Sequence, residues 1–317
     1  MNAKKMKEAL REALPSVDVV IAYGPGFDPL HAEPCFIKDA GRVDDLILNP
    51  LCEHNLAGYL TSQKGRTAVV VKGCDSRTVV QLLQEGLVER EKVHLIGVPC
   101  RGVVSAKKVM AAIGHEKVLS AVFEADSLVV TTGSGEKRLP LMEVCPDKCR
   151  SCQYPTPLIY DVLVDEPLAA DKPPESVYED VEVLEAASLE ERKAYWEKET
   201  GRCIRCYACR NACPLCVCQD SCIAETRDPH WMSQKSTVSE KMMFHLIHAL
   251  HLAGRCTECG ECERACPMGI PLAKLKRKIN KDLKDLFGYV PGTSPEDRPP
   301  LSTFRVDEER IEEHKLP

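Results

Sequence analysis

The sequence predicts an α/β N-terminal domain with a parallel sheet, followed by a mainly α-helical C-terminal domain. Two β-branched runs in the first half, at residues 67–72 and 93–98, have the composition of strands that are buried on both faces. An amphipathic helical pattern separates them, and a short strand–helix–strand crossover implies a right-handed parallel pair. The second half carries one cysteine pattern twice, at residues 203–213 and 256–266, with a helical segment between the copies.

The composition limits the classes of protein to which this chain belongs. Its 317 residues are enough for two or three domains, and its net charge of −6 argues against nucleic acid as a main partner. No apolar run approaches the roughly 20 residues that a membrane span needs. The first eight residues, Met-Asn-Ala-Lys-Lys-Met-Lys-Glu, are not followed by the apolar stretch of a signal peptide. We therefore expect a cytoplasmic chain without a membrane span, whose eighteen cysteines bind metal rather than form disulfides.

The first half alternates helical and strand patterns along the chain. Met6, Leu10 and Leu14 share one face of a Lys- and Glu-rich stretch, which predicts an amphipathic helix over residues 3–13. The apolar pattern then predicts a strand over 17–22, a Gly- and Pro-rich loop over 23–36, a helix over 107–113 and a strand over 128–131.

Two short turns follow the two parallel strands. Because ligands bind at the carboxyl ends of the strands in open parallel sheets, both turns are expected to face one crevice. The pair indicates a site for a phosphate-bearing cofactor or for an iron–sulfur cluster. The alternative is that Cys74 and Cys100 pack as small hydrophobic side chains. The candidate cofactor-binding residues are Gly73, Cys74, Asp75, Ser76, Arg77, Pro99 and Arg101.

A C-x3-C-x2-C run, Cys145, Cys149 and Cys152, offers three thiolates within eight residues. A [4Fe-4S] cluster commonly takes four cysteines, and Cys100 is the best candidate for the fourth, ahead of Cys74, Cys35 and Cys52. Zinc with one further ligand is the main rival, because a C-x2-C pair is half of a common zinc site. The same spacing occurs in radical S-adenosylmethionine enzymes, but there it opens an early loop of a barrel, whereas here a linker and a second domain follow it.

A boundary between domains is predicted where the composition changes. Residues 165–180 contain three prolines and many acidic side chains, which is typical of a linker. A charged helix over 184–199, capped by Ser188, then leads into Cys203. We expect four segments: an α/β domain at 1–160, a linker at 161–183, a cysteine-rich helical domain at 184–290 and an extended tail at 291–317.

The insert between the two cysteine copies has two parts. The second part predicts a helix over residues 237–252, whose three histidines are expected to pack or hydrogen-bond near a metal cluster rather than bind metal: His245, His248 and His251. The first part offers ligands for another metal, although a separate cluster is not expected there: Cys216, Cys218 and Cys222.

A basic amphipathic helix is predicted over residues 270–286. Its Lys and Arg side chains form either a solvated face or a docking surface for an acidic partner, and the sequence favours neither interpretation. They are Lys274, Lys276, Arg277, Lys278, Lys281 and Lys284.

Both cysteine copies read C-x2-C-x2-C-x3-C-P, which is the cysteine run of bacterial-type ferredoxins with two [4Fe-4S] clusters. A zinc site needs two C-x2-C pairs, not a third cysteine at the same spacing and a fourth followed by proline. In two-cluster ferredoxins the fourth cysteine of each run ligates the other cluster. Carried over to this chain, the resemblance implies one cluster on Cys203, Cys206, Cys209 and Cys266, and a second on Cys256, Cys259, Cys262 and Cys213.

The N-terminal half also resembles a known family. Residues 72–77, the Gly97-Val98-Pro99-Cys100 turn and the C-x3-C-x2-C run are similar to segments in beta subunits of F420 (deazaflavin)-reducing hydrogenase and of formate dehydrogenase. The C-terminal half resembles the two-cluster ferredoxin domain of heterodisulfide reductase iron–sulfur subunits. The family implies electron transfer between a catalytic subunit and an acceptor. Many members carry FAD and reduce the deazaflavin, but this chain has no N-terminal ferredoxin module and a short N-terminal domain.

The expectation is therefore an iron–sulfur relay subunit with two [4Fe-4S] clusters and a third at the domain junction. Its expected partners are other subunits of a redox complex: a catalytic dehydrogenase or hydrogenase subunit, or a heterodisulfide reductase-like flavoprotein. The alternative is a flavin-containing oxidoreductase subunit, with FAD at the strand-end crevice, that reduces deazaflavin, NAD or a similar acceptor. A structural zinc scaffold is a third, weaker interpretation.

Overall fold

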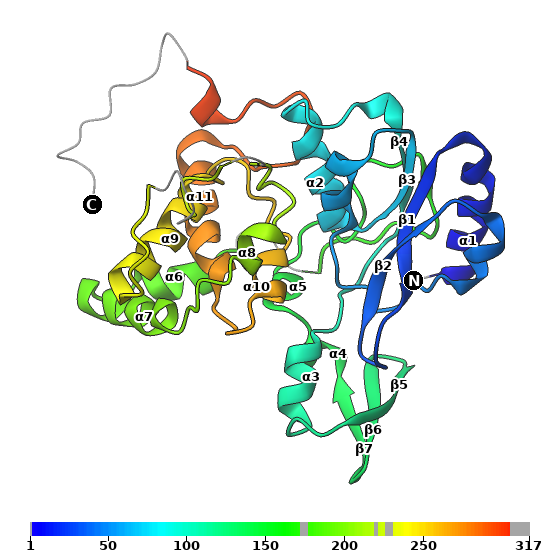
Figure 1. The fold of residues 1–317 in the computed structure, drawn as a ribbon, viewed down its shortest axis with the longest axis horizontal. Coiled ribbons are helices and arrows are strands. Elements are labelled where there is room, and N and C mark those ends of the chain that lie inside the picture. The colour runs from blue at the N-terminus through cyan, green and yellow to red at the C-terminus, as the bar shows by residue number, and fades with distance from the viewer. Residues whose placement is uncertain (1, 172–176, 219–220, 226–230, 305–317) are drawn as a thin grey trace.

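The computed structural model describes residues 2–171, 177–218, 221–225 and 231–304. A five-stranded sheet forms the centre of the N-terminal half, in the order β2-β1-β3-β4-β8 (Figure 1). Three neighbouring pairs are parallel, and only β1 and β2 run antiparallel. The strands are β1 (Val19–Pro25), β2 (Ala32–Ile37), β3 (Thr67–Val71), β4 (Val93–Gly97) and β8 (Val162–Leu163). The predicted α/β fold class is confirmed.

The predicted loop over residues 23–36 is wrong in part. β1 continues to Pro25, and β2 occupies Ala32–Ile37 as its antiparallel neighbour. The hairpin was not predicted because proline has no N–H to donate and is therefore rare in central strands. Pro34 is tolerated here because β2 is the edge strand of the sheet and has a neighbouring strand on one side only.

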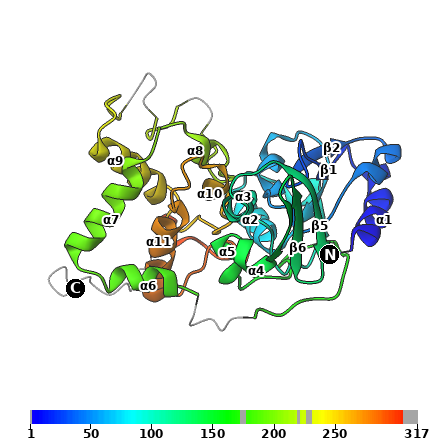
Figure 2. The ribbon, with the colours of Figure 1, turned by 90° about the horizontal axis from the view of Figure 1, so that it is seen from below.

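Helices cover both faces of the main sheet. Helix α1 (Ala3–Ala13) lies on the side away from the C-terminal half, and α2 (Gly73–Gln84) lies on the side toward it (Figure 2). β3 is buried along its whole length, as the β-branched composition predicts. Because α2 starts directly after β3, the turn at its N-terminus faces the second half of the molecule.

A second, three-stranded antiparallel sheet stands apart from the first (Figure 1). It consists of β5 (Val118–Glu124), β6 (Ser127–Thr132) and β7 (Gly135–Pro140), of which the sequence predicted only β6. Helix α3 (Ala106–Ala112) leads into it, and the short helices α4 (Leu141–Val144) and α5 (Asp147–Arg150) return the chain to the domain junction.

The C-terminal half is helical, as predicted. The predicted helix over 184–199 is two helices, because Ser188 starts a new one with a capping box to Glu191. The helices are α6 (Glu179–Glu185), α7 (Leu189–Gly201), α8 (Ala208–Asn211), α9 (Val238–Leu250), α10 (Glu261–Ala265) and α11 (Leu272–Phe287). Among the described residues, no helix is both long and apolar enough to cross a bilayer.

After α11 the chain returns to the N-terminal half and packs along α2. Arg77 Nη2 donates to the Pro291 carbonyl at 2.7 Å, and Gln84 Nε2 donates to the Asp297 carbonyl at 2.8 Å. Gly292 lies so close that an added Cβ would be 2.4 Å from the Arg77 carbonyl oxygen. The described start of the predicted tail is therefore a fixed segment, and residues 305–317 lie outside the described residues.

Candidate metal centres

The two cysteine loops share one backbone conformation. Arg205 and Tyr207 have φ of 53° and 58°, and the matching positions in the second loop, Glu258 and Gly260, have φ of 57° and 76°. Positive φ is uncommon for residues other than glycine, so three such residues at equivalent places mark a turn that the loop requires. The turn also points a backbone donor inward, since the Arg205 N–H donates to Cys203 Sγ at 3.3 Å.

Each loop closes a small cavity with one cysteine from the other loop. The first cavity, of about 10 Å³, is lined by Cys203, Cys206, Cys209 and Cys266. The second, of about 20 Å³, is lined by Cys213, Cys256, Cys259 and Cys262. These quartets are the two crossed ligand sets that the ferredoxin resemblance implies.

The first cavity also has an unpaired donor. His245 is 3% exposed and lines this cavity, and neither of its ring nitrogens has a hydrogen-bond partner among the described residues. Burial, helped by the nearby Lys276 ammonium, lowers the pKa of His245 to about 4, so the ring is neutral and has one N–H to donate. A cluster sulfur is the acceptor that this donor lacks, which means that the residues present fit an iron–sulfur cluster.

The thiols of these cavities need a metal to ionise. Burial raises the pKa of Cys209 and of Cys256 to about 12 each, although Lys276 opposes the shift. A cysteine binds metal as the thiolate, so metal binding must displace these protons. Four thiols that line one small cavity are typical of a closed metal site, whereas cysteines that only pack in a core do not gather in fours.

A third and larger cavity, of about 340 Å³, lies at the junction of the two halves. Four cysteines line it: Cys74 from the start of α2, Cys100 from the turn after β4, and Cys149 and Cys152 around α5. The Gly102 N–H donates to Cys100 Sγ at 3.4 Å, and burial raises the pKa of Cys149 to about 12. The cavity also has cationic lining residues, which include Lys72, Arg77 and Lys148.

Cys145 does not line the junction cavity. It lines a neighbouring cavity of about 570 Å³, together with Pro99 and Arg101. Its Sγ donates to the Met142 carbonyl at 3.3 Å. The structure therefore brings together two of the three cysteines in the C-x3-C-x2-C run, and it supplies Cys74 and Cys100 beside them.

The predicted cofactor-binding residues fall into three groups. Cys74 and Arg77 line the junction cavity, whereas Pro99 and Arg101 line its neighbour. Gly73 permits close packing, because a Cβ there would lie 1.6 Å from the Tyr154 carbonyl oxygen. The remaining two are fully buried and bonded within the protein: Asp75 to Lys72, and Ser76 to the Gly73 carbonyl and the Leu158 N–H.

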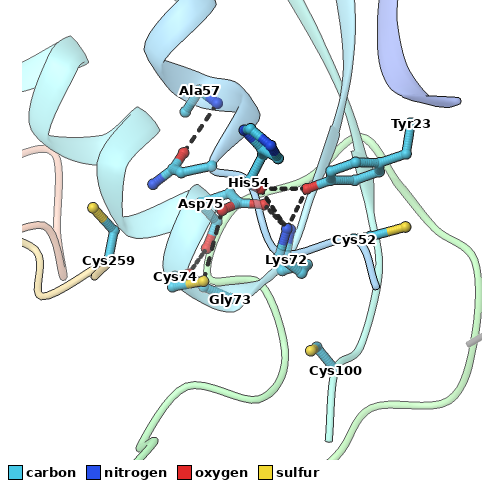
Figure 3. A network of polar contacts seen from close by, with 12 residues as sticks. Tyr23, Cys52, His54, Ala57, Lys72, Gly73, Cys74, Asp75, Cys100 and Cys259 are labelled. Atoms are coloured by element: carbon cyan, nitrogen blue, oxygen red, sulfur yellow. Dashed lines mark hydrogen bonds and ion pairs between the residues drawn. The ribbon is translucent and has the colours of Figure 1, made fainter. Parts of the chain in front are cut away.

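Lys72 is the centre of a buried polar network that the sequence did not reveal (Figure 3). Its ammonium pairs with the Asp75 carboxylate at 2.9 Å and donates to Tyr23 Oη and to the His54 carbonyl. Burial disfavours the charge of Lys72, but Asp75 outweighs this effect, so the pKa of Lys72 is raised. Burial and the Asp75 charge raise the pKa of Tyr23 well above its usual value. The cation is therefore permanent, and it faces the junction cavity.

Lys148 connects the junction cavity with the second cysteine loop. Its Nζ donates to the Cys259 carbonyl, and its aliphatic chain packs where a Cβ on Gly260 would lie. The charges of Cys74 and Cys149 are among those that raise its pKa, against the opposing effect of burial. Lys148 therefore lies between the junction cysteines and the second quartet.

The insert cysteines take different places. Cys213, Cys216 and His248 have ligand atoms within 4.8 Å of one another, with Cys216 Sγ 3.3 Å from His248 Nε2. This is the one such group of three among the described residues, and it shares Cys213 with the second quartet. Cys218 is exposed, and Cys222 packs against the C-terminal core.

Comparison with known proteins adds independent observations. A family model described as a 4Fe-4S dicluster domain matches residues 202–270. The F420-dependent formate dehydrogenase subunit beta of Methanocaldococcus jannaschii is 25% identical over an alignment of 346 positions, gaps included, which covers 90% of this chain and 89% of that protein. The F420-dependent formate dehydrogenase 1 subunit beta of Methanococcus maripaludis is 24% identical over an alignment of 347 positions, which also covers 90% of this chain and 89% of that protein.

One of the solved structures that were found similar to this chain matches it only in part. It is the F420-reducing [NiFe] hydrogenase complex from Methanosarcina barkeri, derivatised with xenon, in which a chain matches with a TM-score of 0.37 and 16% identity. The match covers 48% of this chain and 59% of that one, which is too little to define a common fold. The resemblance predicted from the sequence is confirmed by the curated relatives: over 90% of its length this chain is similar to beta subunits of F420-dependent formate dehydrogenases, and its residues 202–270 match the 4Fe-4S dicluster domain.

Proposed function

We propose that this chain is an iron–sulfur electron-transfer subunit of a multi-subunit dehydrogenase or hydrogenase complex. The observation that carries the proposal is the pair of crossed cysteine quartets, each closed around one cavity. When bound, [4Fe-4S] clusters supply one-electron transfer at potentials that depend on burial and hydrogen bonds. The relatives named as formate dehydrogenase beta subunits support the same kind of complex.

The arrangement of the cavities supports one order of electron transfer. The junction cavity adjoins the second quartet through Lys148, whose Nζ donates to the Cys259 carbonyl. The second quartet shares its loops with the first, because Cys213 and Cys266 are exchanged between them. The first quartet reaches the surface at Cys206, which is exposed beside Ile204. The order is therefore junction, second quartet, first quartet and surface, in either direction.

For the junction we propose a third cluster on Cys74, Cys100, Cys149 and Cys152. These four line one cavity, whereas Cys145 lines the neighbouring cavity and donates to the Met142 carbonyl. Compared with the ligand set predicted from the sequence, this proposal keeps Cys100, Cys149 and Cys152 and replaces Cys145 by Cys74. Lys72, Arg77 and Lys148 supply positive charge that offsets the negative charge of a thiolate-bound cluster.

The partners we propose are a catalytic subunit on one side and a cytoplasmic electron acceptor or donor on the other. The relatives are named for dependence on F420, so a deazaflavin-linked complex with a formate dehydrogenase catalytic subunit is the first candidate. A heterodisulfide reductase-like flavoprotein is the second. The surface around Cys206 and Ile204 is the contact that we assign to one of these partners.

A second candidate function is a flavin-containing oxidoreductase subunit. The volume of the junction cavity favours it, because about 340 Å³ is far more than the 10 to 20 Å³ of the two quartet cavities. This volume is within the usual range of small-molecule sites. Arg77 stacks over Tyr154 at 4.6 Å and would meet an anionic aromatic ligand such as FAD.

Iron, acid-labile sulfide and flavin in the anaerobically purified full chain test these proposals. Three clusters require about 12 iron and 12 sulfide per chain, and two require about 8 of each. About 8 iron and 8 sulfide per chain would mean that the junction cysteines bind zinc or are free thiols, and a zinc measurement separates these two cases. Stoichiometric FAD would favour the second candidate, and absence of iron would overturn the relay function.

A further inference from the structure

The basic helix α11 turns part of its charged face inward. The sequence left these side chains either solvated or available to an acidic partner, and the side chain of Lys278 is 42% exposed. Lys276, however, is 4% exposed and lines the second cavity with Cys213, Cys256, Cys259 and Cys262. For Lys276, neither interpretation from the sequence holds.

The groups around the Lys276 ammonium are thiols and neutral rings. The charges that favour its protonated form come first from Cys262, Cys213, Cys256 and Cys209, the first three of which line the same cavity as Lys276. The last, Cys209, belongs to the first quartet. His245 and His248 also face it, and burial together with Lys276 lowers their pKa to about 4 and about 2, so both rings are neutral.

Two carboxylates line this cavity and both are paired, whereas a third carboxylate nearby, Glu263, feels the Lys276 charge at longer range and accepts from the Ala273 N–H at 2.9 Å. Glu258 accepts from Arg277 Nη1 at 2.6 Å, and Glu261 accepts from Arg264 Nη2 at 2.8 Å. In the described part of the chain, no carboxylate lies within 4.0 Å of the Lys276 ammonium. The other deeply buried lysine, Lys72, shows the contrast, because it has the Asp75 carboxylate at 2.9 Å.

A buried ammonium without an anion is costly, and proteins pair such charges or neutralise them. The strongest anionic charges acting on Lys276 are the thiolates of the two quartets, and the Glu263 carboxylate, which makes no ion pair with Lys276, is a weaker one. A cubane with four thiolate ligands has a net negative charge, so bound clusters would supply the missing counter-charge. The cost of burying Lys276 is therefore tied to cluster binding.

We propose that Lys276 is the shared counter-ion of the two C-terminal clusters and that it raises both reduction potentials, the potential of the second cluster more than that of the first. The proposal rests on the relay function above. Reduction adds one negative charge to a cluster, and a fixed positive charge nearby stabilises the reduced form. Coulomb energy falls with distance, and Lys276 lines the cavity of the second quartet but not that of the first.

The test is a potentiometric titration of the full chain, followed by electron paramagnetic resonance. Lys276→Met removes the charge and keeps most of the side-chain volume, whereas Lys276→Arg keeps the charge. Lys278→Met is the matched control, because Lys278 lies on the same helix but has a half-exposed side chain that is paired with Glu185 and Asp282. Iron and sulfide are measured for every variant, so loss of a cluster is distinguished from a change in its potential.

The expected result is a more negative potential for the second cluster in Lys276→Met, by at least a tenfold fall in its reduction equilibrium constant, or about 59 mV for one electron. The potential of the first cluster shifts less, and both potentials in Lys276→Arg and in Lys278→Met stay close to those of the unmodified chain. Full iron with unchanged potentials in Lys276→Met, or equal shifts in Lys278→Met, overturns the counter-ion role and leaves the relay function intact. Absence of clusters from the unmodified chain instead overturns the relay function itself.

A variant that loses its clusters is also informative. If Lys276→Met does not retain iron, Lys276→Gln is measured beside it. If both neutral variants lose iron and Lys276→Arg keeps its full iron content, the position requires a positive charge, which supports the proposal. Loss in Lys276→Arg as well shows that packing, not charge, is what the position requires, and this result overturns the proposal.

Discussion

Lys148 donates a hydrogen bond to the backbone carbonyl of Cys259, although the two residues are 111 positions apart in the chain. This contact sets the junction cysteines beside the second quartet, and it depends on a close approach at Gly260. Gly260 has φ of 76°, and a Cβ there would meet the Lys148 side chain at 2.6 Å.

We therefore expect Gly260→Ala to destabilise the loaded protein by more than the backbone strain of about 1–2 kcal/mol that a left-handed residue costs. Gly269→Ala is the matched control, because Gly269 also has positive φ, at 60°, but nothing lies within 4 Å of its added Cβ. Denaturant unfolding of the two variants measures the difference. Equal losses would mean that the contact with Lys148 contributes nothing to stability.

The ligands of the junction site can be assigned by cysteine replacement. Cys74→Ser and Cys100→Ser should each reduce the iron content of the purified chain by about four atoms, the content of one [4Fe-4S] cluster. Cys145→Ser should leave it unchanged, since Cys145 lines the neighbouring cavity. Iron analysis of the three variants decides, and a loss of iron in Cys145→Ser and Cys100→Ser, with Cys74→Ser unchanged, would restore the ligand set predicted from the sequence.

The Lys72–Asp75 pair should be essential as a pair. Both side chains are buried, so Asp75→Asn leaves an uncompensated ammonium and should cost roughly 3–5 kcal/mol of unfolding free energy. The double variant Lys72→Met/Asp75→Asn removes both charges and should lose less than Asp75→Asn alone. Chemical denaturation of the loaded proteins measures both. A double variant that loses the sum of the single effects would show that the two charges do not interact.

His54 should make stability depend on pH. Burial, with the charge of Arg264, lowers its pKa to about 4, whereas an unfolded histidine has a pKa of about 6.5. Below pH 6.5 the unfolded chain binds a proton that the folded chain does not, so stability falls as the pH falls toward 4 and this effect then levels off. His54→Gln cannot bind that proton.

The measurement is the unfolding free energy of both proteins between pH 8 and pH 4.5. The difference between His54→Gln and the unmodified chain should move in favour of the variant as the pH falls below 6.5. Comparison of two proteins with the same cysteines removes the acid sensitivity of the clusters. A difference that is constant across this range would contradict a neutral, half-buried His54.

Local sequence patterns predicted the parts of the fold that depend on composition and spacing. The buried strand β3, the cap at Ser188 and the helical character of the C-terminal half follow from residue types and their order. The edge strand β2 was missed because Pro34 and the Gly- and Pro-rich residues before it resemble a loop, and β5 and β7 because most of their side chains are partly or fully exposed and give no clear apolar pattern. The cysteine quartets were readable because the ferredoxin spacing already encodes which loops must meet.

The rest of the site depends on contacts between distant segments. The choice of Cys74 rather than Cys145 at the junction cavity follows from how the turn after β3 packs against residues 149–154, which no spacing rule states. Tyr23 meets Lys72 across 49 positions. The inward direction of Lys276 was also hidden, because its neighbours in sequence are exposed or half-buried lysines that suggest a solvent-facing row.

The return of the chain onto α2 has a consequence for the speed of electron transfer. The two halves are held together by the contacts of Pro291 with Arg77, of Asp297 with Gln84 and of Cys259 with Lys148. These separate attachments leave no hinge about which the cysteine-rich half could swing as a mobile carrier. Tunnelling distances inside the chain are then constant, so internal transfer should not slow down as glycerol raises the viscosity of the solvent.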